Sequence, residues 1–485
     1  MKTQKEYNQC QQPTSCHNCS SNQICQAWVD FVKHHNDTKP YAHFDLRVSL
    51  SMPSIRKYVM DRTKIVTHSF YPFIHFEKKN SRYGKKGPKK PRELYYCSHL
   101  DRCVYQRYAF LLNYQYSIWA CENNIDDVAI AYRDNLGKNN IDFAKDAFDA
   151  IRSFPQCFIF VGDFTNFFDN LEHQYLKKMM CEVLGVERLP QDYFSVFKNI
   201  TRFSSWDWKD IVKAAGENIA ERGVRKKINS KETVLTKEQF QKNKKDIKKN
   251  ISGVGVPQGS PISAVLSNIY MIKFDKDIKR YVICKGGIYM RYSDDFIIVL
   301  PYERDAEIAD FTSYIFSYVE SMKGLIDLQK EKTSCYTYKD EVIYEGDQPS
   351  SINYLGFLFD GKSIRIRPRA ITKYYYRMRR KAHAIGRSNW ISSKGRRISA
   401  KELYSIYSRN DEKQTFIDYA RKAKGILKLN DQEANALIKH HKRKIAMAIK
   451  EGQKKIRRTL MIPRLRIMSV LLAAPVCQPL SSISS

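Results

Sequence analysis

The chain has 485 residues, of which 43% are hydrophobic and 28% are charged, a composition that suits a globular protein of several domains. Its 83 lysines and arginines against 51 aspartates and glutamates give a net charge of +32. So large a surplus indicates a polyanionic partner, and nucleic acid is favoured over a membrane surface because no basic amphipathic helix stands out. No apolar run approaches a membrane span and no secretory signal opens the chain, so we expect a cytoplasmic protein with no membrane partner.

Four cysteines lie close together in the polar N-terminal extension, residues 1–60. They are Cys10, Cys16, Cys19 and Cys25, with the spacing C-x5-C-x2-C-x5-C. Four thiolates can close a tetrahedral zinc site, but this compact spacing is not that of a familiar zinc motif. The alternative is a set of reduced thiols, which is the commoner state of cysteines in a protein of this class.

A basic segment with glycines and a proline follows, "EKKNSRYGKKGPKKPRELYY" at residues 77–96. Gly84, Gly87 and Pro88 interrupt its lysines, so the segment predicts a hairpin or loop instead of a helix. The next stretch, "DRCVYQRYAFLLNYQYSIWACE" at residues 101–122, carries apolar residues at helical spacing and predicts a helix.

A short apolar strand is predicted in "CFIFVGDF", residues 157–164, and Asp163 stands at its end. An apolar-periodic helix near residues 175–184 follows, and Gly185 stops it. From about residue 204 to residue 250 the chain becomes polar and rich in lysine, which indicates an insertion or an exposed subdomain.

Two adjacent aspartates interrupt the apolar stretch "IYMRYSDDFIIVL", residues 288–300. The pattern predicts a β-hairpin with Asp294 and Asp295 at or beside its turn. A turn needs only one aspartate for its geometry, and adjacent carboxylates repel each other. An exposed turn is the alternative, but Asp163 also ends an apolar strand. Three carboxylates on neighbouring strands can hold two Mg²⁺ ions about 4 Å apart, the arrangement used for in-line displacement at phosphorus.

Five motifs occur in one order along the chain: "DFTNFFDNLEH" from Asp163, "GVPQGSPISAVLSNIYM" from Gly255, "YSDD" from Tyr292, "LQKEKTSCY" from Leu328 and "NYLGF" from Asn353. Together they resemble motifs A to E of the palm of reverse transcriptases, especially the bacterial branch of retron, group II intron and phage-defence enzymes. Each motif is weak alone, whereas all five in this order are specific. The basic segment and the helix before them resemble the fingers motifs more loosely. The resemblance covers roughly residues 75–360.

The resemblance implies an α+β right-hand polymerase fold. The fingers would span residues 61–155, and the palm, with an antiparallel sheet and the YxDD hairpin, would span residues 156–360 and include the lysine-rich insertion. A basic helical thumb with a C-terminal extension would fill residues 361–485. The implied activity is that of an RNA-directed DNA polymerase, a nucleotidyltransferase that uses two Mg²⁺ ions and dNTPs to make DNA.

The resemblance also assigns catalytic roles. Asp163, Phe164, Asp294 and Asp295 match the family's metal-binding positions. Lys332 matches the motif D lysine that would protonate the leaving pyrophosphate, where an ammonium group serves as proton donor and counter-charge. The alternative for Lys332 is an ordinary surface lysine.

Further matches concern the incoming nucleotide. Phe168 matches the aromatic residue under its sugar, which would exclude a 2′-hydroxyl and favour dNTPs; the alternative is a core phenylalanine. The other substrate-binding candidates are Phe164, Gln258, Gly259 and Tyr292, together with Lys90, Arg92 and Arg102 of the fingers, for which ordinary backbone-phosphate binding is the alternative.

Tyr354, Leu355 and Gly356 match the primer grip, a turn that would position the primer 3′ end. In the thumb, "KYYYRMRRK" interleaves cations with tyrosines and suits a phosphate backbone with occasional base stacking. Tyr374, Tyr375 and Tyr376 would permit a tyrosine hydroxyl to serve as primer, a hypothesis that fails if the DNA product separates from the protein without proteolysis.

Several functions are compatible with these motifs. A standalone chain of this size with a long insertion most resembles the defence-associated reverse transcriptases, for which a structured non-coding RNA is the expected partner. Retron and group II intron types are the alternatives within the family, and no nuclease constellation accompanies the motifs. A non-catalytic RNA-binding scaffold and an RNA-dependent RNA polymerase are the alternatives outside it. The oligomeric state is left open.

Overall fold

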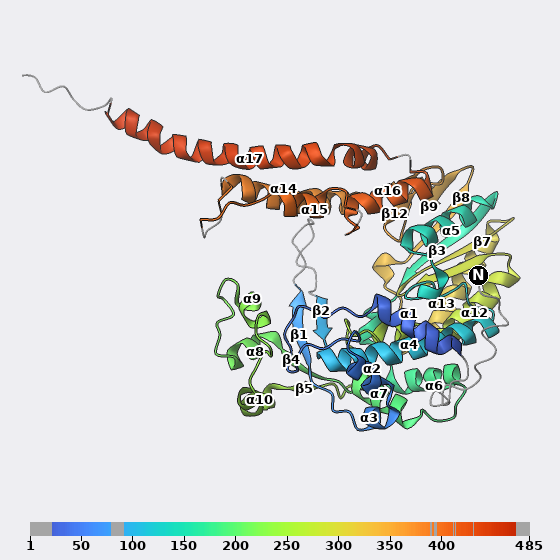
Figure 1. Ribbon diagram of the computed structural model, residues 1–485. Helices are drawn as coiled ribbons and strands as arrows, with labels where there is room; N and C mark the ends of the chain where they lie inside the picture. Colours follow the sequence, from blue (N-terminus) through green and yellow to red (C-terminus); the bar gives the residue numbers. More distant parts are fainter. Residues whose placement is uncertain are drawn as a thin grey trace, which may run out of the picture. The chain divides into compact units, whose positions relative to one another are not determined.

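The computed structural model describes residues 22–78 and 92–471, except residues 389, 392–394, 411, 413 and 430. The chain forms two compact units (Figure 1). The first contains the residues up to Gly137 and Gln156–Cys335, and the second contains Lys138–Pro155 and the residues from Tyr336 onward. Residues 138–155, expected at the end of the fingers, therefore fold with the C-terminal part of the chain.

Several helices of the first unit pack on one buried helix, α4 (His99–Glu122). Its Ser98 cap accepts a hydrogen bond from the main-chain N–H of Asp101, which satisfies one of the free donors of the first turn. The helix predicted for residues 101–122 is thereby confirmed. The other helices of this unit, outside the lysine-rich segment, are α1 (Asn22–His34), α2 (Pro53–Met60), α3 (Arg62–Val66), α6 (His173–Leu184), α7 (Gln191–Thr201), α11 (Ser263–Tyr270), α12 (Ile272–Cys284) and α13 (Ala306–Ser321).

Three antiparallel strands hold the predicted carboxylates at their ends or in the turn that joins them: β3 (Gln156–Asp163), β6 (Ile288–Tyr292) and β7 (Asp295–Pro301). The central strand β7 pairs with β3 from Pro301 to Asp295 and with β6 on its other side. Its interior residues are all buried, because the sheet is covered on both faces and an apolar run is the pattern of such a strand. The pairing of β3 with β7 therefore brings the end of β3 next to the start of β7.

A second sheet contains the hairpin predicted from the basic segment. Strands β1 (Phe73–Lys78) and β2 (Arg92–Tyr96) pair antiparallel. The lysine-rich segment adds to them, since β4 (Ser204–Asp207) runs parallel to β1 and β5 (Lys248–Lys249) pairs with β4. The segment expected as an insertion in the palm is thus built onto the sheet of the fingers.

The lysine-rich segment shares an apolar core with β1 and with residues near Phe44. Trp206 is fully buried among residues that include Phe44, Ile74 and Val212. Burying side chains of this size contributes about 1.5–3 kcal/mol each, which explains why a segment so rich in lysine still folds. Its helices are α8 (Trp208–Ala214), α9 (Val224–Asn229) and α10 (Lys237–Asn243).

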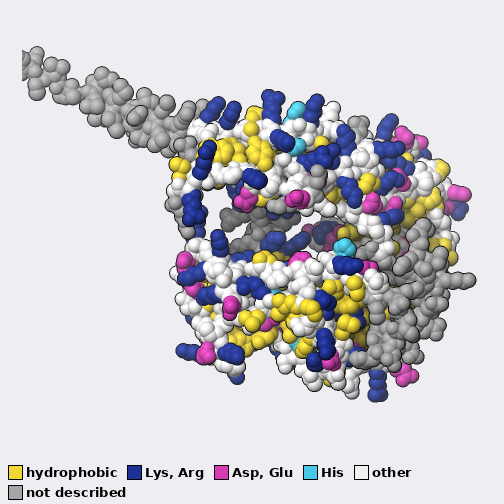
Figure 2. All heavy atoms as spheres, viewed as in Figure 1, with side chains coloured by type: hydrophobic (Ala, Val, Ile, Leu, Met, Phe, Trp, Pro, Cys, Tyr) yellow, Lys and Arg dark blue, Asp and Glu magenta, His cyan; other side chains and the backbone are white. Residues whose placement is uncertain are grey.

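The second unit combines short strands with basic helices. Its helices are α5 (Asn140–Arg152), α14 (Pro368–Arg387), α15 (Lys401–Tyr407), α16 (Phe416–Leu427) and α17 (Gln432–Leu471), and its strands are β8 (Ser334–Lys339, which begins in the first unit), β9 (Val342–Glu345), β10 (Gln348–Pro349), β11 (Ile352–Tyr354), β12 (Phe357–Phe359) and β13 (Ile364–Ile366). Lysine and arginine side chains are scattered over the face of α14 and α17 that Figure 2 shows. Among the described residues, no helix is both long and apolar enough to span a membrane.

Candidate active site

The two adjacent aspartates lie where the sequence predicts, in a tight hairpin. Tyr292 pairs with Asp295, so that only Ser293 and Asp294 form the turn between β6 and β7. Ser293 has a φ of +63°, and a positive φ at the first of two turn residues is typical of a type II′ hairpin. Asp294 therefore stands in the turn, and Asp295 begins the following strand.

The third aspartate is brought to the same place by the register of the sheet. Asp163 is the Cα partner of Asp295, and the main-chain N–H of Phe164 donates to the main-chain oxygen of Asp294 at 3.1 Å. Asp163 is only 5% exposed. Residues more than 130 positions apart in the chain thus form one compact group of three carboxylates.

Burial and mutual repulsion make this group electrostatically costly. Burial raises the pKa of Asp294, and the charge of Asp163 raises it further. Burial, the charge of Asp294 and a hydrogen bond with Asp163 raise the pKa of Asp295 to about 7. Carboxylates held together in this way need a cation nearby to remain ionised.

Lys332 supplies one such cation. It lies in a single 3-10 turn, Lys330–Lys332, and its Nζ donates to Oδ1 and Oδ2 of Asp163 at 2.8 and 2.9 Å. The main chain fixes this approach, because Gln329 N–H donates to the main-chain oxygen of Asp163 at 2.7 Å. The side chain of Lys332 is 54% exposed, so it can move without breaking a packed contact. Lys332 thus adjoins the carboxylates, while its predicted catalytic role stays a prediction.

The donor chemistry of the group fits Mg²⁺. Mg²⁺ prefers carboxylate oxygens and keeps several water ligands, so it does not need a closed protein cage. Asp163, Asp294 and Asp295 supply such oxygens. Within the described ranges, no three His, Cys, Asp or Glu side chains already form a ready-made metal site, and both oxygens of Asp163 are held by Lys332. Binding of a divalent ion to Asp163 therefore requires that Lys332 move.

Phe164 can contribute to this site only through its main chain. Its side chain is buried and packs on the rings of Phe167 and Phe296, with centroids 5.7 and 5.1 Å away. The ring belongs to the hydrophobic core, so the predicted role of Phe164 in binding substrate can rest only on its main chain. Its main-chain oxygen remains a candidate metal ligand.

Phe168 lies in the 3-10 turn Phe167–Asp169 and is half-buried. Its main-chain oxygen accepts a hydrogen bond from Val256 N–H at 2.9 Å, which ties motif A to the loop before Gln258. The ring is thus held at the junction of the two motifs that resemblance places around the incoming nucleotide. Its role in sugar selection stays a prediction.

The PQG turn leaves no room for side chains at its glycine. Gly259 has a φ of +118°, and a Cβ there would lie 2.3 Å from the main-chain oxygen of Tyr95 in β2. The main-chain N–H of Tyr95 donates to the oxygen of Gln258 at 2.9 Å. The turn and the fingers sheet therefore approach each other backbone to backbone, which only glycine allows.

The predicted cations of the fingers are placed differently from one another. Arg92 is exposed at the start of β2, and Lys90 lies outside the described residues. Arg102 is buried in α4 at 5% exposure, and its Nη2 donates to the main-chain oxygen of Asp37 at 2.7 Å. This internal contact weighs against the predicted role of Arg102 as a free triphosphate contact.

The predicted primer grip is a tight hairpin in the second unit. Leu355 and Gly356 have φ values of +48° and +95°, and two positive φ values in a two-residue turn are typical of type I′. Asn140 Nδ2 donates to the main-chain oxygen of Leu355 at 3.1 Å and fixes the turn on α5. Tyr354 is buried, so the part of the turn that solvent reaches is Leu355 and Gly356, which are both half-buried.

The sequence analysis did not predict a buried ion pair that lies under the catalytic hairpin. Arg291 and Asp275 are both fully buried, and two hydrogen bonds of 2.8 and 2.6 Å join them. Arg291 Nη1 also donates to the main-chain oxygen of Ser293 at 2.9 Å. The available signal was an arginine inside the apolar strand "IYMRY", which must find a buried partner.

The predicted zinc site falls on residues that the structure does not describe. Cys10, Cys16 and Cys19 lie outside the described ranges, as does the side chain of Cys25.

Carboxylates lie at the end of an antiparallel palm sheet, and a glycine turn packs against the fingers. These features define a polymerase of the right-hand fold. A family model described as reverse transcriptase (RNA-dependent DNA polymerase) matches residues 78–359, which is more than half of the chain. The chain belongs to the reverse transcriptase family and has its α+β right-hand fold.

Other comparisons find more distant likeness. No curated protein matches the chain. Among solved structures, apo telomerase from Candida tropicalis without its C-terminal domain matches at 11% identity and a TM-score of 0.39, over 70% of this chain and 65% of that one. Telomerase from Candida albicans with a fragment of telomeric RNA matches at 13% identity and a TM-score of 0.35, over 88% and 69%. The chain thus spans slightly less than two thirds of the first of these proteins.

Proposed function

We propose that this chain polymerises DNA on an RNA template by two-metal nucleotidyl transfer. The observation that carries the proposal is the convergence of Asp163, Asp294 and Asp295 at the paired ends of β3 and β7. In the reaction the primer 3′-hydroxyl oxygen forms a bond to the α-phosphorus of a dNTP, and the bond from that phosphorus to the bridging oxygen breaks. Two bound Mg²⁺ ions would supply activation of the hydroxyl and neutralisation of the departing pyrophosphate.

The side chains around the carboxylates suit this reaction. Asp163, Asp294 and Asp295 would hold the cations, and Lys332 would move from Asp163 to the leaving pyrophosphate and give it a proton. Phe168 lies under the sugar of the dNTP and excludes a 2′-hydroxyl. Gly259 lets the nucleotide approach the backbone of the turn closely.

The biological setting that we propose is antiphage defence in the bacterial cytoplasm, with a structured non-coding RNA as partner and template. The support is the motif resemblance together with the net charge of +32, which suits a long RNA. Retron and group II intron enzymes are the alternatives within the family.

Incorporation of labelled dNTPs by protein purified with its own RNA tests the activity. We expect Mg²⁺-dependent incorporation that ribonuclease pretreatment abolishes and that Asp294→Ala/Asp295→Ala abolishes without loss of RNA binding. Sequencing the product identifies the template. RNA binding without any incorporation of dNTPs would overturn the proposal in favour of a scaffold, and preferential use of NTPs would indicate an RNA polymerase.

A further inference from the structure

Two adjoining cavities form a trough on the first unit. One has a volume of about 870 Å³ and the other of about 470 Å³. They share four wall residues: His34, His35, Gln106 and Pro261. Together they can hold more than one nucleotide, since ligand pockets of about 300–1,000 Å³ accommodate molecules of that size.

The trough lies between three helices and reaches the catalytic hairpin. Its walls come from α1, from α4 and from the start of α11, and α1 lies outside the segment that matches the family model. At one end stands Tyr132, whose hydroxyl donates to Ser293 Oγ at 3.2 Å. Ser293 is the residue before Asp294 in the catalytic turn. A strand lying in the trough would therefore lead to the carboxylates.

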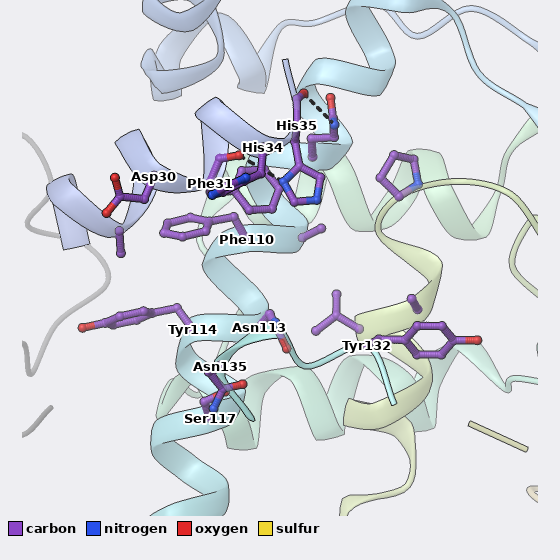
Figure 3. Close-up of a pocket in the computed structure, with 16 residues that line it drawn as sticks. Asp30, Phe31, His34, His35, Phe110, Asn113, Tyr114, Ser117, Tyr132 and Asn135 are labelled. Atoms are coloured by element: carbon purple, nitrogen blue, oxygen red, sulfur yellow. Dashed lines mark hydrogen bonds between the residues drawn. The ribbon is translucent and has the colours of Figure 1, made fainter. Parts of the chain in front are cut away.

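Aromatic rings line the larger cavity. Figure 3 shows Phe31, Phe110, Tyr114 and Tyr132 around it, and the rings of Phe31 and His35 stack with centroids 4.1 Å apart. Rings at the wall of an open groove are stacking surfaces for unpaired bases, and such stacking is tolerant of sequence. The lining thus suits a single strand better than a duplex.

Polar atoms at the walls lack partners in the described part of the chain. Gln106 is 6% exposed and its Oε1 accepts no hydrogen bond, while its Nε2 donates to the main-chain oxygen of His35 at 3.4 Å. Asn113 Oδ1, Arg102 Nε and Ser260 Oγ are likewise without a partner. The end torsions of Gln and Asn are broad, so a small rotation turns their oxygens into the cavity.

The amide oxygens Gln106 Oε1 and Asn113 Oδ1 can only accept hydrogen bonds. The sugar–phosphate backbone of DNA offers no donor, whereas each ribose of RNA offers a 2′-hydroxyl. Ser260 Oγ can donate to a phosphate or base oxygen, whereas Arg102 is held inside the protein by the main-chain oxygen of Asp37. The wall is therefore complementary to the 2′-hydroxyl groups of an RNA strand, whereas the backbone of a DNA strand would leave these acceptors unsatisfied.

We propose that the trough binds unpaired ribonucleotides of the template ahead of the catalytic turn, and that Gln106 and Asn113 select RNA over DNA by accepting from 2′-hydroxyl groups. This inference rests on the proposed function, because it assumes an RNA template. It adds sugar selection in the template strand, which is separate from the selection of the incoming nucleotide by Phe168.

The test uses primer–template duplexes whose single-stranded 5′ template extension is RNA, 2′-fluoro RNA or DNA, with the duplex unchanged. The 2′-fluoro group keeps the RNA-like sugar conformation and cannot donate a hydrogen bond. Dissociation constants by fluorescence anisotropy are expected to be about tenfold lower for RNA than for either other extension. Gln106→Met and Asn113→Leu should each reduce that ratio to about threefold or less, whereas Gln174→Met, at an exposed position of α6, should leave it unchanged.

Equal affinity of the unaltered protein for RNA and 2′-fluoro RNA extensions would overturn the inference. So would a ratio that survives both substitutions, given thermal melting that shows each variant folded. Single-nucleotide dNTP addition to the same duplexes separates the two proposals. Addition without sugar discrimination refutes the trough and leaves the polymerase standing. Discrimination without addition supports the trough as an RNA site and refutes the polymerase.

Discussion

At the scale of single residues, the catalytic group is a place where function and stability oppose each other. Three carboxylates meet at two strand ends, two of them with raised pKa values, and one lysine neutralises part of their charge. The bonds of Lys332 to both oxygens of Asp163 place an ammonium group where a divalent cation would have to bind. Lysine and metal are therefore competitors for the same carboxylate.

Substitution of Lys332 should separate metal binding from chemistry. Lys332→Met removes the competing ammonium group, so the affinity for Mn²⁺, measured by electron paramagnetic resonance, is expected to rise several-fold. Single-turnover dNTP addition is expected to slow by about 10²- to 10⁴-fold, because the proton donor is lost. Lys323→Met, at an exposed lysine just after α13, is the matched control for the Mn²⁺ affinity and for the rate of dNTP addition. Unchanged Mn²⁺ affinity would contradict the competition.

Substitution of Asp295 should stabilise the metal-free protein. The pKa of this carboxyl is about 7 when folded against an ordinary value of 3.8, so its ionised form opposes folding. Wild-type stability should therefore fall as the pH rises from about 4 through 7. Asp295→Asn should add about 2–4 kcal/mol to the free energy of unfolding at pH 8, and less at pH 5. Thermal or urea unfolding in EDTA measures this, with the exposed Asp310→Asn as control. A destabilised Asp295→Asn protein would count against the electrostatic account.

At the scale of elements, a buried hydrogen-bond network stabilises the catalytic hairpin. Arg291 in β6 reaches Asp275 in α12 and also donates to the main-chain oxygen of Ser293, so that one guanidinium ties strand, helix and turn together. Tyr289 donates to the same aspartate at 2.8 Å. A left-handed Ser293 is strained for a residue with a side chain, and this network stabilises it.

Breaking the ion pair should cost more than a surface pair does. Arg291→Met leaves Asp275 buried without its cation, which is expected to lower the free energy of unfolding by about 3–5 kcal/mol. The exposed pair of Arg304 and Glu307 provides the comparison, and Arg304→Met should cost less than about 1 kcal/mol. Urea unfolding followed by tryptophan fluorescence measures both. Similar costs for the two variants would mean that the buried pair does not hold the hairpin.

The helices α14 and α17 approach each other through glycines. A Cβ on Gly386 would lie 2.2 Å from the main-chain oxygen of Ile449, and one on Gly452 would lie 2.7 Å from that of His383. Gly452→Ala should therefore force the helices apart and destabilise the second unit. Gly425→Ala, in α16 with open space around it, should instead stabilise it by about 0.5–1 kcal/mol, because alanine favours helix. Hydrogen exchange of the α14 and α17 amides distinguishes these outcomes. Equal protection in both variants would contradict the close crossing.

At the scale of the whole molecule, charge sets the affinity for RNA. A net charge of +32 predicts many contacts to phosphate, each of which releases a counterion. The dissociation constant for its RNA should therefore rise by about a thousandfold or more between roughly 50 and 200 mM salt. Filter binding across this range gives the slope. A nearly flat slope would show that shape and base contacts, not phosphates, dominate binding.

The amino-acid sequence by itself determined the family, the hairpin of Asp294 and Asp295 and the long helix α4. These features depend on short-range spacing: apolar alternation, turn residues and five ordered motifs. The motifs also singled out Lys332, but its ion pair with Asp163 came only from the structure.

Only the tertiary structure decided the rest. Parallel pairing of β4 with β1 joins residues about 130 positions apart, and no local periodicity encodes such a pairing. The same holds for the burial of Arg102, for the pair of Arg291 with Asp275 and for the trough beside α4. Each of these features depends on which polar groups are buried next to one another. Distant elements bury these groups together only when they pack and exclude water.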